Sequence, residues 1–113
     1  MIETKLGEFE EVILLLTGIL GDDAYAFKIA DEFEKQTGRN VSIGAVHSTL
    51  DRLETKGFVT SEMGASTAER GGRRKRIFTI SALGKRTLKA SYEFKVSLWK
   101  QYPDFAHLMK VSF

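Results

Sequence analysis

A run of positive charge around residues 70–76 is the part of this 113-residue chain best suited to bind another molecule. Five of these seven positions are Arg or Lys, and Glu69 is the one carboxylate beside them. Cations in a glycine-containing loop, such as the tip of a β-hairpin, can reach the phosphates or the narrow minor groove of a nucleic acid. The simpler alternative is a solvated charged loop. The cations are Arg70, Arg73, Arg74, Lys75 and Arg76.

A second candidate surface lies on the helix predicted after Ser42, whose hydroxyl is a good acceptor for the free amides of the first turn. Its apolar stripe, predicted to face the core, is Ile43, Val46, Leu50 and Leu53. The opposite face is small and polar, as a helix that enters the major groove requires, although an ordinary solvated face is the alternative. That face and its flanks comprise Gly44, Ala45, His47, Ser48, Thr49, Asp51, Arg52 and Thr55.

The sequence lacks the combinations of residues that catalysis, metal binding or disulfides require. Cysteine is absent, and the two histidines, His47 and His107, fall on separate predicted elements. No nucleophile has an accompanying base, and the adjacent glycines 71 and 72 lack the spacing of a phosphate loop. We therefore expect no enzyme, no cofactor and no metal site.

The elements that would position these residues form a helix-turn-helix followed by a hairpin. Apolar spacing of three and four predicts helices over about 6–20 and 26–37, with Gly21 and Gly38 at their ends and Asp22 or Asp23 capping the second. The third helix is followed by β-branched and aromatic strands at 58–63 and 76–80. A two-stranded hairpin is marginal alone, so it should pack on the helices. The expected fold is mainly α with a small β-hairpin, a winged helix-turn-helix.

A last helix, capped by Ser81 and stopped near Pro103, is apolar over much of its circumference. Such a helix needs cover on more than one side, and a second subunit is the simplest cover, so we expect a homodimer. A further hypothesis is that the apolar residues of this helix line an apolar pocket between subunits that binds a small aromatic effector. Packing in the core and in the dimer would explain the same residues. The residues concerned are Leu88, Tyr92, Phe94, Val96, Leu98 and Trp99, with Leu83 at the start of the helix.

Charge is distributed unevenly over two expected regions, a winged helix-turn-helix at 1–80 and a dimerisation helix and tail at 81–113. Residues 1–63 hold 6 Lys/Arg and 12 Asp/Glu, whereas residues 64–113 hold 11 and 3. One basic half predicts a surface for a polyanion. No signal peptide or membrane-spanning run is visible, so we expect a cytoplasmic location and no membrane partner.

The segment from Ser42 to Val59 resembles the PadR-like transcriptional regulators. It reads SIGAVHSTLDRLETKGFV, where family members show a serine, a glycine, an aromatic-proline pair, a leucine and R-L-E-x-x-G. Residues 76–84, RIFTISALG, look like the family's R-x-Y-x-[IL]-T-x-x-G. His47-Ser48 replaces the usual tyrosine-proline, Phe78 replaces a tyrosine and Ser81 a threonine, so the operator sequence does not carry over.

The resemblance implies a homodimer that binds double-stranded DNA through the third helix and the wing. The matching positions on the helix are Ser42, Gly44, Ala45, His47, Ser48, Thr49 and Arg52. It also implies a repressor released by small phenolic or drug-like ligands. Two alternatives stay open: a winged-helix module that binds an acidic protein, and a MarR-like regulator, which usually has further helices on both sides.

Overall fold

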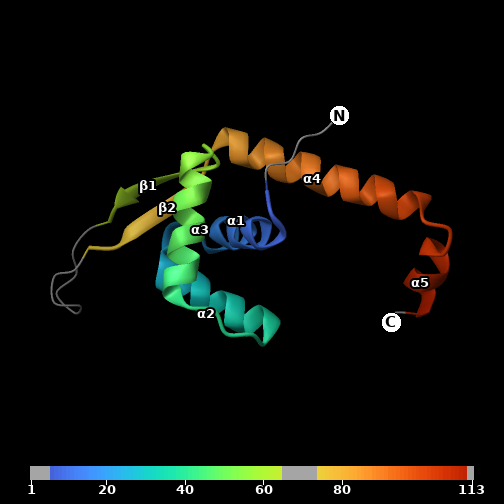
Figure 1. Cartoon of the computed structure of the whole chain (residues 1–113), viewed down its shortest axis with the longest axis horizontal. Coiled ribbons are helices and arrows are strands. Elements are labelled where there is room, and N and C mark those ends of the chain that lie inside the picture. Colours follow the sequence, from blue (N-terminus) through green and yellow to red (C-terminus); the bar gives the residue numbers. More distant parts are fainter. Residues whose placement is uncertain (1–5, 65–73, 112–113) are drawn as a thin grey trace.

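The structure is a computed structural model that describes residues 6–64 and 74–111. Three helices form a cluster, a two-stranded hairpin extends from it, and a long helix leads away to a short terminal one (Figure 1). The molecule is elongated, with extents of 56 × 32 × 20 Å. The elements are α1 (Glu8–Leu20), the 3-10 turn η1 (Gly21–Asp23), α2 (Ala26–Thr37), α3 (Ile43–Thr55), β1 (Val59–Met63), β2 (Arg76–Ile80), α4 (Ala82–Gln101) and α5 (Phe105–Val111).

The core lies where α1, α2 and α3 meet the base of the hairpin. Each helix contributes the apolar residues that the spacing of three and four places on one face, and removing them from water supplies the main driving force for folding. Among the described residues, the apolar ones with no exposed surface are Ile13, Leu14, Ala24, Ile29, Val46, Leu50 and Leu53, and Phe78 of β2 is 1% exposed. The predicted mainly α fold with a small hairpin is confirmed.

The hairpin is fixed to the helices by a backbone hydrogen bond as well as by packing. Strands β1 and β2 pair antiparallel, from Val59 opposite Ile80 to Met63 opposite Arg76. The N–H of Phe78 donates to the carbonyl of Ala24, just after η1, at 2.8 Å. This contact holds the wing, the β1–β2 hairpin, on the helical cluster. A two-stranded hairpin needs such support because it is only marginally stable by itself.

The start of α4 is attached closely to the end of α3. The Ser81 hydroxyl accepts from the N–H of Gly84 at 3.0 Å, as a cap, and donates to the carbonyl of Gly57 at 2.7 Å. Gly84 lies against Phe58, since an added Cβ would overlap the carbonyl oxygen of that residue. The direction of α4 is therefore set by the turn that ends the helix-turn-helix.

Beyond this junction, α4 has little cover within the chain. Its contacts with α1 include Glu11, whose carboxylate accepts from the Ser91 hydroxyl at 3.0 Å and the Lys95 ammonium at 2.7 Å. Gly84 and Ser91 are its only buried residues. In residues 6–64 and 74–111 no helix combines the length and apolar character needed to cross a bilayer.

Two details differ from the sequence-based predictions. Asp22 and Asp23 lie in η1, and α2 begins after Tyr25 without a side-chain cap, so the predicted aspartate cap is wrong. The chain takes up a separate turn there, which places the aspartates too early. The segment after Pro103, expected to be a tail, forms the short helix α5.

Candidate nucleic-acid interface

The exposed face at the start of α3 is small and open. The Ser42 hydroxyl accepts from the N–H of Ala45 at 3.0 Å, which confirms the predicted N-cap. A Cβ added to Gly44 would meet nothing closer than the Ser42 hydroxyl, at 4.0 Å. Another surface can therefore approach the backbone of this turn closely. The exposed residues here are Ser42, Ile43, Gly44, Ala45, His47 and Ser48.

Two residues of α3 differ in exposure from the prediction, Thr49 being buried and Ile43 half-exposed. Thr49 is 1% exposed, and its hydroxyl donates to the carbonyl of Ala45 at 2.9 Å, so the prediction that it belongs to the DNA-facing surface, near bases or phosphates, is wrong. It lies three residues after Val46 and four before Leu53, which places it on the buried stripe. Ile43 is 47% exposed, because the first turn of α3 extends past the core.

Arg52 is held by a buried carboxylate of α1. Its Nε lies 3.3 Å from Glu10 Oε2, and Lys56 Nζ lies 2.8 Å from Glu10 Oε1. Burial acts to raise the pKa of Glu10, but hydrogen bonds from Lys56, the N–H of Gly7 and Arg52 outweigh it and lower the pKa below its usual value. This cluster joins α1 to α3. Phosphate contact by Arg52, whose side chain is 55% exposed, stays a prediction.

The described cations of the wing contact neutral groups. Arg74 Nε donates to the carbonyl of Gly64 at 3.0 Å, and Arg76 Nη1 donates to the Ser61 hydroxyl at 3.1 Å. Lys75 Nζ lies 4.2 Å from the centre of the Tyr25 ring. Among the residues that the structure describes, no carboxylate pairs with these three cations. Arg70 and Arg73 lie outside the described residues.

The hairpin and α3 lie side by side (Figure 1). The His47 ring on α3 meets the Phe78 ring of β2 edge-on, with 6.4 Å between their centres. His47 Nδ1 also lies 3.7 Å from Asp51 on the next turn of the helix. One surface of the molecule thus combines a slim helix face with the base of a cationic wing.

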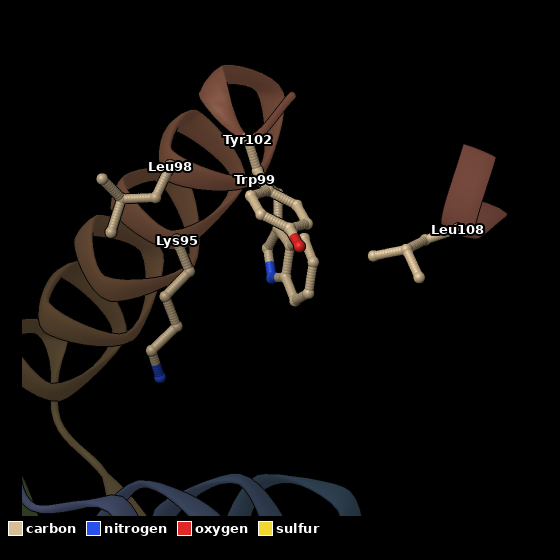
Figure 2. Close-up of a pocket in the computed structure, with 5 residues that line it drawn as sticks. All are labelled: Lys95, Leu98, Trp99, Tyr102 and Leu108. Atoms are coloured by element: carbon tan, nitrogen blue, oxygen red, sulfur yellow. The ribbon is translucent and has the colours of Figure 1, made fainter. Parts of the chain in front are cut away.

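The six residues predicted for a dimer interface or effector pocket are spread around α4. Leu98 and Trp99 line a hollow of about 450 Å³ with Lys95, Tyr102 and Leu108 of α5. Figure 2 shows the rings of Trp99 and Tyr102 close together, with Leu108 directed toward them from α5. Tyr92 and Val96 line a different hollow, Phe94 is exposed, and Leu88 packs against the core. In the part of the chain that the structure describes, these six residues are thus not gathered around one hollow.

The fold is similar to those of solved bacterial regulators. A PadR-like transcriptional regulator from Bacillus cereus shares 20% identity at a TM-score of 0.64, with 93% of each chain covered. A Streptococcus transcriptional regulator shares 18% identity at 0.67, covering 88% of this chain and 94% of that one. Bacillus subtilis PadR in complex with operator DNA shares 18% identity at 0.62, covering 75% of this chain and 46% of that protein.

No curated protein sequence matches the chain. The sequence matches the transcriptional regulator PadR-like family over residues 15–90, which include α2, α3, both strands and the first half of α4. Members of this family are transcription factors and not enzymes. The resemblance carried by the two motifs is therefore confirmed over most of the chain, which belongs to the PadR-like family of transcriptional regulators.

Proposed function

We propose that this regulator represses transcription by binding a pseudo-palindromic operator as a homodimer. The observation that carries the proposal is the surface formed by α3 and the wing. There, a slim exposed helix face adjoins cations that lack carboxylate partners in the described chain. Bacillus subtilis PadR, a protein of similar fold, was solved in complex with operator DNA, which supports operator DNA as the ligand.

The start of α3 would enter the major groove. Ser42, His47 and Ser48 carry exposed groups that can hydrogen-bond to base edges or phosphates, while Gly44 and Ala45 allow close approach. Arg52 and the wing cations would neutralise phosphates, so they set affinity more than sequence preference. For the wing these are Arg74, Lys75 and Arg76 together with Arg70 and Arg73, which lie outside the described residues.

Dimerisation would use residues 81–113, and residues 1–80 would form the DNA-binding unit. The support is the apolar surface of α4, where Tyr92 is 67% exposed and Phe94, Leu98 and Trp99 are each 49% exposed. A second copy of the chain would cover this apolar surface. The resulting dimer would have the two-fold symmetry that matches a pseudo-palindromic operator. A small aromatic effector would bind among the aromatic residues near the end of α4, where the hollow beside Trp99 supports it.

The test is a salt titration of DNA binding by fluorescence anisotropy. Wild-type protein should bind bulk duplex at low salt, with affinity that falls steeply as salt rises. Replacing Arg74 and Arg76 with alanine should weaken binding to all sequences and flatten the salt slope by about 0.9 for each lost phosphate contact. Lys100→Ala with Lys110→Ala removes the same charge from α4 and α5 and serves as control.

Two results would contradict the proposal. An unchanged slope in the Arg74→Ala, Arg76→Ala variant would exclude the wing from phosphate binding. Absence of binding to any duplex by micromolar wild-type protein would favour a winged-helix module that contacts an acidic protein.

A further inference from the structure

We propose that Ile43 is a specificity-determining residue that contacts the 5-methyl group of a thymine in each half of the operator. This inference rests on the proposed function, since it requires that α3 enters the major groove.

The first observation is the unusual exposure of Ile43. It continues the apolar stripe of α3, yet 47% of its surface is exposed, whereas Val46 and Leu50 are completely buried. Its position at the first residue of the helix, directly after the Ser42 cap, places it beyond the core. A branched apolar side chain gains free energy when it leaves water, so this position favours an apolar partner.

The second observation is the chemistry of the surrounding face. Ser42, His47 and Ser48 are polar, Gly44 has no side chain, and Ala45 offers one methyl group. Ile43 is thus the one large apolar group on the exposed start of α3 among the described residues. Because a Cβ added at Gly44 would meet nothing closer than the Ser42 hydroxyl at 4.0 Å, the backbone can approach a second surface closely enough for Ile43 to touch it.

The apolar group that a major groove displays is the thymine methyl. At the same place cytosine displays only a ring hydrogen and its neighbouring amino donor, which an isoleucine would cover without accepting its hydrogen bond. Ile43 should therefore favour T·A over C·G at one position of each half-site. An exposed isoleucine on this face discriminates by contact and by desolvation together.

The experiment removes that methyl group alone. The operator is first selected from randomised duplexes with wild-type protein, and each thymine is then replaced in turn by deoxyuridine. At one thymine per half-site, the substitution should weaken wild-type binding by about fourfold, the value of one buried methyl group. Ile43→Ala should bind the thymine and uracil operators equally at that position, while Ile43→Val, which keeps the branched methyls, should restore most of the discrimination.

The outcomes separate the two proposals. If wild-type protein binds the selected operator but no deoxyuridine weakens it, or if Ile43→Ala keeps the wild-type sensitivity, the role of Ile43 is refuted and the DNA-binding function stands. If no duplex is enriched and none binds, both are refuted. Thermal melting of Ile43→Ala verifies that the variant is folded, as the half-exposed position leads us to expect.

Discussion

A single carboxylate on α1 determines how α3 is held. Glu10 is 7% exposed and contacts two cations, Arg52 of α3 at 3.3 Å and Lys56, directly after α3, at 2.8 Å. It also accepts from the N–H of Gly7 at 2.8 Å. A buried carboxylate without these donors would leave an uncompensated charge. The cluster therefore stabilises the packing of α3 on α1, and through it the presentation of the exposed helix face.

Glu10→Gln should destabilise the protein at neutral pH by about 1–2 kcal/mol, since both cations are partly exposed and their attraction is screened. The lowered pKa of Glu10 means that its contribution is complete above the usual value of 4.5 and is lost as pH falls through the folded-state pKa. The difference between wild type and variant in urea denaturation should therefore shrink in acid. Glu8→Gln, an exposed neighbour on the same turn, is the control, and a difference that does not shrink at all as the pH is lowered below 4.5 would contradict this role.

Two glycines should respond oppositely to alanine. Gly84→Ala should destabilise the fold by at least about 2 kcal/mol, because the added Cβ overlaps the Phe58 carbonyl and lies 2.8 Å from Ile80 Cγ2. At Gly44 an added methyl group has room, so Gly44→Ala should stabilise the fold through helix propensity, by up to about 1 kcal/mol. The same methyl group should weaken DNA binding, because it prevents the DNA from approaching the helix backbone closely. Urea denaturation and anisotropy on the same two variants measure both effects. Undiminished DNA affinity in Gly44→Ala would argue against a close approach at this turn.

At the level of elements, the sequence predicted what local chemistry determines. The caps at Ser42 and Ser81 and the positive-φ ends at Gly21 and Gly38 follow from a few neighbouring residues, and the structure confirms them. α5 was missed because Pro103 indicates a stop but says nothing about a restart. Helix boundaries and caps can thus be predicted from neighbouring residues, whereas the formation of a short helix after Pro103 could not.

The candidate site was predictable only in part for a similar reason. The open face of α3 follows from residue size and helical period, as Gly44 and Ser48 show. Period alone could not show that Ile43 is half-exposed, since that depends on how far the core extends along α3. The buried position of Thr49, by contrast, does follow from its spacing of three from Val46 and four from Leu53. The contacts of Glu10 with Arg52 and Lys56 carry no local signal, because these partners lie 42 and 46 residues away.

The exposed side of α4 should be the dimer interface. Replacing Phe94 and Leu98 with glutamate should produce a folded monomer, since each side chain is 49% exposed in the single chain and the new charges would be buried without partners in a dimer. Analytical ultracentrifugation measures the mass, and the exposed-charge change Lys89→Glu is the control. A dimer of unchanged stability in the double variant would locate the interface elsewhere.

At the level of the whole molecule, the junction at Ser81 and Gly84 connects the end of the helix-turn-helix to α4. Because α4 starts from the turn that ends α3, two paired α4 helices would fix the separation of the two α3 helices. Successive major grooves on one face of DNA are about 34 Å apart. The proposed dimer should therefore require a defined spacing between half-sites.

Inserting about five base pairs between the half-sites should abolish cooperative binding, because the second half-site moves to the opposite face of the duplex. Inserting about ten restores the face but adds about 34 Å, so it should also weaken binding. Competition anisotropy against the uninterrupted operator measures both effects. Equal affinity for all three spacings would show that the two halves bind independently.

The uncovered length of α4 also bears on how long the protein survives in a cell. Beyond Ser91 no described residue of α4 is buried in the single chain, so few buried contacts oppose local unfolding of this segment in an unpaired copy, and proteases cleave the locally unfolded state. If a second copy covers this segment, mass action protects paired chains and leaves solitary ones to be degraded. Dilution by cell growth would then lower the concentration of the regulator directly, and also indirectly, because it raises the fraction of single chains open to degradation. The genes it controls would respond to a narrower range of synthesis rates than dilution alone provides.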